Sequence, residues 1–215
     1  MSFDKTTWRT AADTARQRAE RQVAKVQANP NLSDAGKARA LARLFTQHRE
    51  ELAQLQAEMN GRAAQTARQL ERQLFGTSDR DGQQDAISRR DAEDRATQLA
   101  AKPAQAQAVM ARALRNGDMT LANAIAEVAH TQAQAPIGSA GWSEVMDLWL
   151  EARPDAAPQL QELVSVAAPS IQDNFIDGAL FRPAKPIEIA SLTDGVIEAL
   201  AQASDAAIPA PMNYS

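Results

Sequence analysis

Apolar residues recur at steps of three and four along the first 75 residues, which is the spacing of one face of a helix. The first such stripe runs from Trp8 to Val26 and predicts a helix over about 4–28. Pro30 cannot continue this helix, and Ser33 is a suitable N-cap for the next one. The sequence therefore predicts two consecutive helices joined by a short turn.

The second predicted helix is the longer one, because the chain holds no proline from Asp34 to Phe75. At about 1.5 Å per residue it would be about 60 Å long. Its apolar stripe follows a heptad pattern up to Met59 and a longer repeat beyond Gly61, which is a candidate kink position. We predict an association surface formed by Leu41, Phe45, Leu52, Leu55, Met59, Leu70, Leu74 and Phe75.

The first predicted helix is little more than half as long as the second. A hairpin between them would leave the end of the second helix, with Leu70, Leu74 and Phe75, without cover. Burial of apolar surface is favourable in water, so we expect assembly with a partner to cover it. His48 lies on the same stripe, where a polar residue sets register or lies at an interface.

A series of shorter helices is predicted after residue 83. The segment 84–101 forms one charged helix, and a second occupies 103–116. Gly117 suits the left-handed position after a helix, and Asp118 is the N-cap of the next one, which reaches about Thr131. The helices on either side of this turn should pack through Val109, Met110, Ala113, Leu114, Leu121, Ala124, Ile125 and Val128.

A further helix over about 141–154 carries two of the three tryptophans. Its N-cap is Ser139 or Ser143, and Pro154 ends it. Its apolar face predicts a candidate docking groove that would hold a partner's helix, formed by Trp142, Met146 and Trp149. Another helix follows, and then a short helical turn over about 170–181.

The fold class is therefore all-α, with a long N-terminal helical hairpin or coiled coil and a C-terminal multi-helix domain. This domain carries an extended arm at 182–190, because two prolines exclude a helix and Ile187 and Ile189 alternate with Glu188. The arm is either one strand or a segment laid on a partner. The predicted divisions are a basic hairpin at 1–75, a linker at 76–83, an acidic helical domain at 84–205 and a tail at 206–215.

The formal net charge of −4 conceals an asymmetry along the chain. Residues 1–75 hold 13 Lys and Arg against 8 Asp and Glu, whereas residues 76–215 hold 10 against 19. Two interpretations stay open. The charges form solvated surfaces, or the basic half docks on an acidic partner or on the acidic half of a neighbouring copy.

Residues with catalytic or ligand chemistry are sparse. The absence of cysteine removes disulfides, thiolate nucleophiles and cysteine-ligated metals, and His48 and His130 are the only histidines. Asp79, Asp81 and Gly82 mimic part of a calcium loop, but the first and last ligand positions lack carboxylates. No nucleophile elbow, phosphate loop or base-reading module is present. We therefore expect no enzyme, no cofactor, no metal and no direct nucleic-acid contact.

No apolar run approaches the roughly 20 residues of a membrane span, and no apolar stretch follows the first charges as in a secretory signal. The sequence predicts a soluble protein made in the cytoplasm.

Two stretches carry a resemblance to a known class of proteins. They are "NPNLSDAGKARALARLFTQHREELAQLQAEMNGRAAQTARQLERQLFG" and "AQAVMARALRNGDMTLANAIAEVAHTQ" with the later "GWSEVMDLWLEARP". Both resemble small α-helical structural proteins in the morphogenesis modules of tailed bacteriophages and prophages, especially of actinobacteria. The resemblance covers about half the chain and includes no catalytic signature.

The resemblance implies a non-enzymatic virion protein of the head or neck, of the minor capsid, decoration or connector type, located in the virion after synthesis in the bacterial cytoplasm. Its partners would be further copies of itself, or capsid, portal or connector proteins. A capsid-assembly scaffolding protein is an alternative. Many scaffolding proteins carry a basic capsid-binding end at the C-terminus, whereas the basic half of this chain is N-terminal, which counts against this alternative. A bacterial helical adaptor or chaperone is a second alternative, which would use the Trp142 groove.

Overall fold

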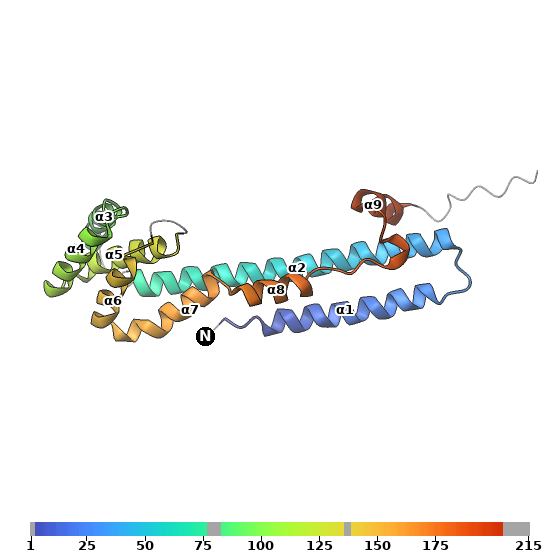
Figure 1. The fold of residues 1–215 in the computed structure, drawn as a ribbon, viewed down its shortest axis with the longest axis horizontal. Coiled ribbons are helices and arrows are strands. Elements are labelled where there is room, and N and C mark those ends of the chain that lie inside the picture. Colours follow the sequence, from blue (N-terminus) through green and yellow to red (C-terminus); the bar gives the residue numbers. More distant parts are fainter. Residues whose placement is uncertain (1–2, 77–82, 136–138, 204–215) are drawn as a thin grey trace, which may run out of the picture. The chain divides into compact units, whose positions relative to one another are not determined.

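The computed structural model describes residues 3–76, 83–135 and 139–203, and every regular element in these ranges is helical (Figure 1). The all-α class predicted from the sequence is confirmed. Two compact units make up the chain. Unit 1 comprises Met1–Phe3 and Ala63–Pro169, and unit 2 comprises Asp4–Arg62 and Ser170–Ser215.

This division differs from the predicted boundaries at 75 and 84, because it falls inside the long helix α2 (Asp34–Phe75). The helix runs without interruption through Gly61, and its last turns belong to the core of unit 1. The C-terminal segment from Ser170 belongs with the first helix in unit 2. Residues 77–82 of the predicted linker, with its partial calcium loop, and the predicted tail at 206–215 lie outside the described residues.

Unit 2 is built on the predicted hairpin, in which α1 (Thr6–Gln27) lies antiparallel to α2 (Figure 1). The hydroxyl of Ser33 accepts a hydrogen bond from the amide of Gly36 at 3.2 Å, which supports its predicted capping role. Three further elements complete the unit: α8 (Ile171–Leu180), the 3-10 turn η2 (Ile187–Ile189) and α9 (Asp194–Gln202). A small core joins η2 and α9 to α2 and is formed by Ala42, Phe45, Ile189 and Ile197.

The predicted arm at 182–190 is only partly extended. Its end forms η2, in which Ile189 is fully buried and Ile187 is 84% exposed. Lys185 lies 5.9 Å from the centre of the Phe45 ring and forms an ion pair with Asp194. The arm is therefore neither a strand nor a free segment, because it packs on α2 and α9 of its own chain.

Within the segment 170–181, where only a short helical turn is predicted, residues 171–180 form a full helix. The hydroxyl of Ser170 accepts from the amide of Asp173 at 3.1 Å and caps α8, which is 10 residues long.

Unit 1 packs the end of α2 against shorter helices. These are α3 (Gln83–Thr97), α4 (Pro103–Arg115), α5 (Met119–Ala133), α6 (Trp142–Ala152), the 3-10 turn η1 (Pro154–Ala156) and α7 (Ala157–Ala167). The predicted turn between α4 and α5 is confirmed. Gly117 has φ of 71°, and Asp118 accepts from the amide of Leu121 at 3.0 Å.

The predicted cap of α6 is wrong. Neither Ser139 nor Ser143 caps this helix, since Gly141 occupies the N-cap position with φ of 85°. A Cβ atom at this glycine would lie 3.2 Å from Cβ of Pro103. The left-handed backbone and the close approach of α4 both favour glycine here.

Candidate interaction surfaces

The predicted association surface on α2 is mostly buried within the chain itself. Leu55 is half-buried, and the exposed fraction of every other member is 7% or less: Leu41, Phe45, Leu52, Met59, Leu70, Leu74 and Phe75. These side chains are core residues, so the structure does not offer them to a partner.

The end of α2, expected to need a partner for cover, is covered by unit 1. The Phe75 ring lies 5.5 Å from the Trp149 ring and 5.8 Å from the His130 ring, centre to centre. Arg153 donates to the carbonyl of Leu74 at 2.9 Å. The prediction that Leu70, Leu74 and Phe75 need a partner for cover is therefore wrong, because the chain itself buries them.

The candidate docking groove on α6 is also closed. Trp142, Met146 and Trp149 are 1%, 8% and 0% exposed and belong to the core of unit 1. The Trp149 indole donates to Asn123 at 3.1 Å, which satisfies its polar atom in the interior. Pattern alone could not separate this core face from a groove, because the helices that cover it come from other parts of the chain.

Acidic side chains of the C-terminal segment pair with basic side chains of the hairpin in unit 2. Arg9 of α1 contacts both Asp173 and Asp177 of α8 at 2.7 Å. Arg49 of α2 contacts Glu198 of α9 at 2.6 Å. Ion pairs within one chain therefore neutralise part of the charge asymmetry of the sequence.

Helix α8 presents an apolar face to solvent. Ile171 and Phe175, four residues apart and therefore on one face of the helix, are 89% and 76% exposed. Ile176 is 39% exposed, and a Cβ atom at Gly178 would meet nothing within 4 Å. The opposite face holds Asp177, which is 7% exposed. Within the described residues this is the most exposed apolar pair on any one helix.

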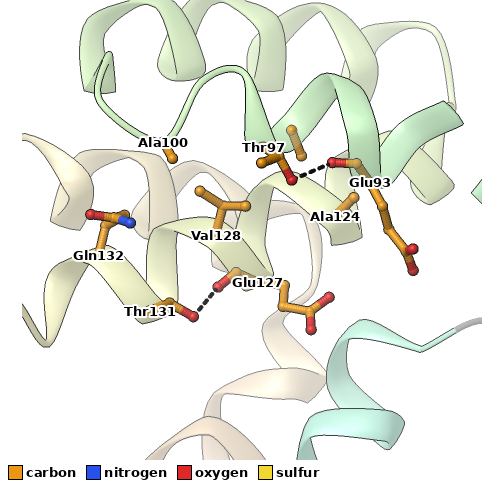
Figure 2. A pocket seen from close by; sticks show the side chains of 9 residues that line it. Glu93, Thr97, Ala100, Ala124, Glu127, Val128, Thr131 and Gln132 are labelled. Carbon is orange, nitrogen blue, oxygen red and sulfur yellow. Dashed lines mark hydrogen bonds between the residues drawn. The ribbon is translucent and has the colours of Figure 1, made fainter. Parts of the chain in front are cut away.

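A groove of about 470 Å³ lies between α3 and α5 in unit 1 (Figure 2). Its lining consists mostly of alanine, threonine and carboxylate side chains: Glu93, Ala96, Thr97, Ala100, Ala124, Glu127, Val128, Thr131 and Gln132. Figure 2 shows Glu93 and Glu127 at one end of it, and Ala100 and Gln132 at the other.

Both threonine hydroxyls in the groove already donate hydrogen bonds within their own helices. Thr97 donates to the carbonyl of Glu93 at 2.8 Å, and Thr131 donates to the carbonyl of Glu127 at 3.0 Å (Figure 2). The Glu93 carboxylate accepts from Arg89 at 2.6 Å. The Glu127 carboxylate has neither a hydrogen bond nor an ion pair with any described residue.

Glu127 is an exposed residue, but its surroundings favour the neutral carboxyl more than water does. Partial desolvation in the groove is the largest effect and raises the pKa of this carboxyl. Glu93 and Glu71 act in the same direction, whereas Arg89 lowers the pKa. A cation brought into the groove would relieve this cost. Sequence reasoning missed the groove, because its two helices bring together positions about 30 residues apart.

The two histidines lie in unlike places. His48, which is 9% exposed, lines two cavities of about 140 Å³ each. One lies between α1 and α2, and the other is also lined by residues 184–186. The Nδ1 atom of His48 has no hydrogen-bond partner in the part of the chain that the structure describes, and burial lowers the pKa of the ring. His130 contacts Gln134 at 2.7 Å, and burial lowers its pKa too. The neutral ring is thus favoured at both sites.

Among the described helices, none combines the length and apolar character that a membrane span requires. Nor do three or more His, Asp or Glu side chains come together as metal ligands anywhere in the described ranges. Comparisons of the chain with protein-family models, with curated proteins and with solved structures found no match in any of the three.

Proposed function

We propose that this chain is a non-enzymatic structural protein that acts by docking on other proteins, and that it is a component of the head or neck of a tailed-phage virion. The minor capsid, decoration and connector types are the proposed placements. The docking part is carried by the exposed face of α8, with Ile171 and Phe175. The virion part rests on the resemblance of residues 29–76, 106–132 and 141–154 to phage morphogenesis proteins.

The α8 face favours docking because of how the helix is held. Its acidic side is fixed on α1 by Arg9 and Lys5, so the apolar side is turned to solvent. Apolar residues gathered on one exposed face are typical of interaction sites. The proposed partner surface is an apolar face of a capsid, portal or connector protein, since the α8 face itself carries Ile171, Phe175 and Gly178 and no charge.

A scaffolding role differs from this proposal in its timing, because a scaffold leaves before the particle matures. The adaptor alternative loses its main support, since the Trp142 groove on which it depended is closed. We therefore propose the virion role first. The protein content of precursor and mature particles distinguishes it from the scaffolding role.

The test uses phage particles made in a host with either the unchanged gene or the variant Ile171→Ser/Phe175→Ser. Mass spectrometry of purified precursor and mature particles measures the copies of the protein in each. We expect the unchanged protein in mature particles and at least about tenfold less of the variant, because its apolar contact is lost. The control is Ile187→Ser, which alters an 84% exposed residue outside α8.

Presence in precursors alone would assign the chain as a scaffold instead. Absence from both kinds of particle, or equal incorporation of the α8 variant, would overturn the proposal. Circular dichroism of both variants checks that they fold, which the exposure of the altered side chains leads us to expect.

A further inference from the structure

We propose that the groove between α3 and α5 binds helix α1 of a second copy of this chain, through Arg21 and Lys25. The contact joins two different surfaces, so each copy can both offer α1 and accept it. This inference is independent of the virion proposal, because it uses other residues and its test needs no particle.

The chemistry of the groove favours a segment that carries a cationic side chain with small side chains beside it. Alanines and Val128 form its apolar surface, and both threonine hydroxyls are satisfied within their own helices. The exposed Glu127 carboxylate has no hydrogen bond or ion pair with a described residue, and the Glu93 carboxylate lies at the same end of the groove (Figure 2). Both are acceptors that a cation would pair with.

Helix α1 presents a face of matching chemistry. Its exposed stripe at steps of four and three consists of Gln17, Arg21, Ala24 and Ala28, with Lys25 beside it. Among the described residues, Arg21 donates to the carbonyl of Gln17, and the exposed Lys25 forms no hydrogen bond or ion pair. By contrast, Arg9 and Arg18 of the same helix form ion pairs within unit 2.

The dimensions of the two surfaces agree. The lining residues span Glu93 to Ala100, on α3 and the turn that follows it, and Ala124 to Gln132 along α5, or roughly 10–12 Å. The stripe on α1 from Gln17 to Ala28 spans roughly 16 Å, so it covers the groove from end to end. Alanine on both sides allows two helices to approach closely.

A contact between unlike surfaces has a consequence for assembly. In a two-fold dimer, α1 of each copy would lie in the groove of the other copy. In any other arrangement the contact continues from copy to copy, and it builds a ring if the rotation closes and a filament if it does not.

The test measures the mass of the full-length protein by light scattering on a sizing column. We expect oligomers at about 0.1 M salt and smaller species at about 1 M, because the Debye length falls from about 10 Å to about 3 Å. Glu127→Lys and Arg21→Glu/Lys25→Glu should each weaken self-association at least about tenfold. The triple variant Glu127→Lys/Arg21→Glu/Lys25→Glu restores opposite charges and should restore the oligomers.

Two control variants make the same charge changes elsewhere. Glu151→Lys on α6 alters another exposed carboxylate of unit 1, and Arg112→Glu/Arg115→Glu alters exposed cations of α4. Neither should change the mass. The proposal is overturned if the unchanged protein is monomeric at low salt, if the triple variant fails to reassemble, or if the controls dissociate equally.

One further outcome separates the two proposals. If the oligomer persists in Glu127→Lys and is lost in Ile171→Ser/Phe175→Ser, the α8 face joins the copies and the groove does not. That result would refute this inference and leave the particle experiment to judge the virion role.

Discussion

The Nε atom of Arg9 lies 2.7 Å from Oδ1 of Asp177, a carboxylate that is 7% exposed on a helix whose apolar residues face solvent. Lys5 lies 3.2 Å from the other carboxylate oxygen. Helix α8 is therefore oriented by charge and not by its hydrophobic residues. This orientation is what leaves Ile171 and Phe175 available for a partner.

Replacing Arg9 with Met should destabilise unit 2. Asp177 would keep only Lys5, and a buried carboxylate that loses a partner costs about 2–3 kcal/mol. The free energy of unfolding in urea measures the loss. The control is Arg18→Met, whose ion pair with Glu51 is exposed and should cost less than about 0.5 kcal/mol. Equal losses in the two variants would contradict the orienting role of the Arg9 pair.

Replacing Asp118 with Ala should lower the stability of unit 1 by about 1 kcal/mol, because the first turn of α5 loses its cap. Ser143→Ala is the matched control. The pattern of the sequence also allowed Ser143 as a cap, but its hydroxyl contacts only Glu144, so the loss should stay below about 0.5 kcal/mol. Thermal unfolding of both variants distinguishes them, and a larger loss at Ser143 would show that the cap assignment is wrong.

Acidification should destabilise the hairpin through His48. The ring binds a proton less readily in the folded state than in the unfolded chain, where its pKa is about 6.5. Its effect on stability is therefore absent well above this value and grows as the pH falls toward the folded-state pKa. Burial is the main cause, and Arg16 and Arg18 add to it, whereas Glu51 and Glu20 oppose it.

The variant His48→Leu tests this pH dependence. We expect the unchanged protein to lose more unfolding free energy than the variant between about pH 7 and about pH 5.5. His130 has a lowered pKa as well, and the raised pKa of Glu127 acts in the opposite direction, but both are present in both proteins and cancel in the comparison. Parallel pH curves would show that His48 is not the titrating group.

The helices themselves were predictable because their signals are local. A stripe at steps of three and four, the glycine at 117 and the cap at Asp118 act within a few residues, and the structure follows them. The cap of α6 was not predictable from α6 alone. Gly141 is needed because Pro103, nearly 40 residues earlier, comes within van der Waals reach.

The candidate sites depend even more on contacts between distant segments than the helix caps do. A stripe such as Trp142, Met146 and Trp149 shows that a helix has an apolar face, but it does not show what covers that face. Burial is a property of the whole fold, and here other helices of unit 1 supply the cover. The reverse holds on α8, where an ordinary short helix is exposed on its apolar side because Arg9 binds the other side.

The sequence by itself determined that this protein is all-helical, where its long helix runs and which turn joins α4 to α5, because periodicity and capping are short-range effects. Only the tertiary structure decided which apolar faces are core and which acids neutralise which bases. It also placed Glu127 in a groove between α3 and α5, where no described residue pairs with its carboxylate. Those outcomes depend on contacts between segments far apart in the chain, and helical spacing carries no information about which segments will meet.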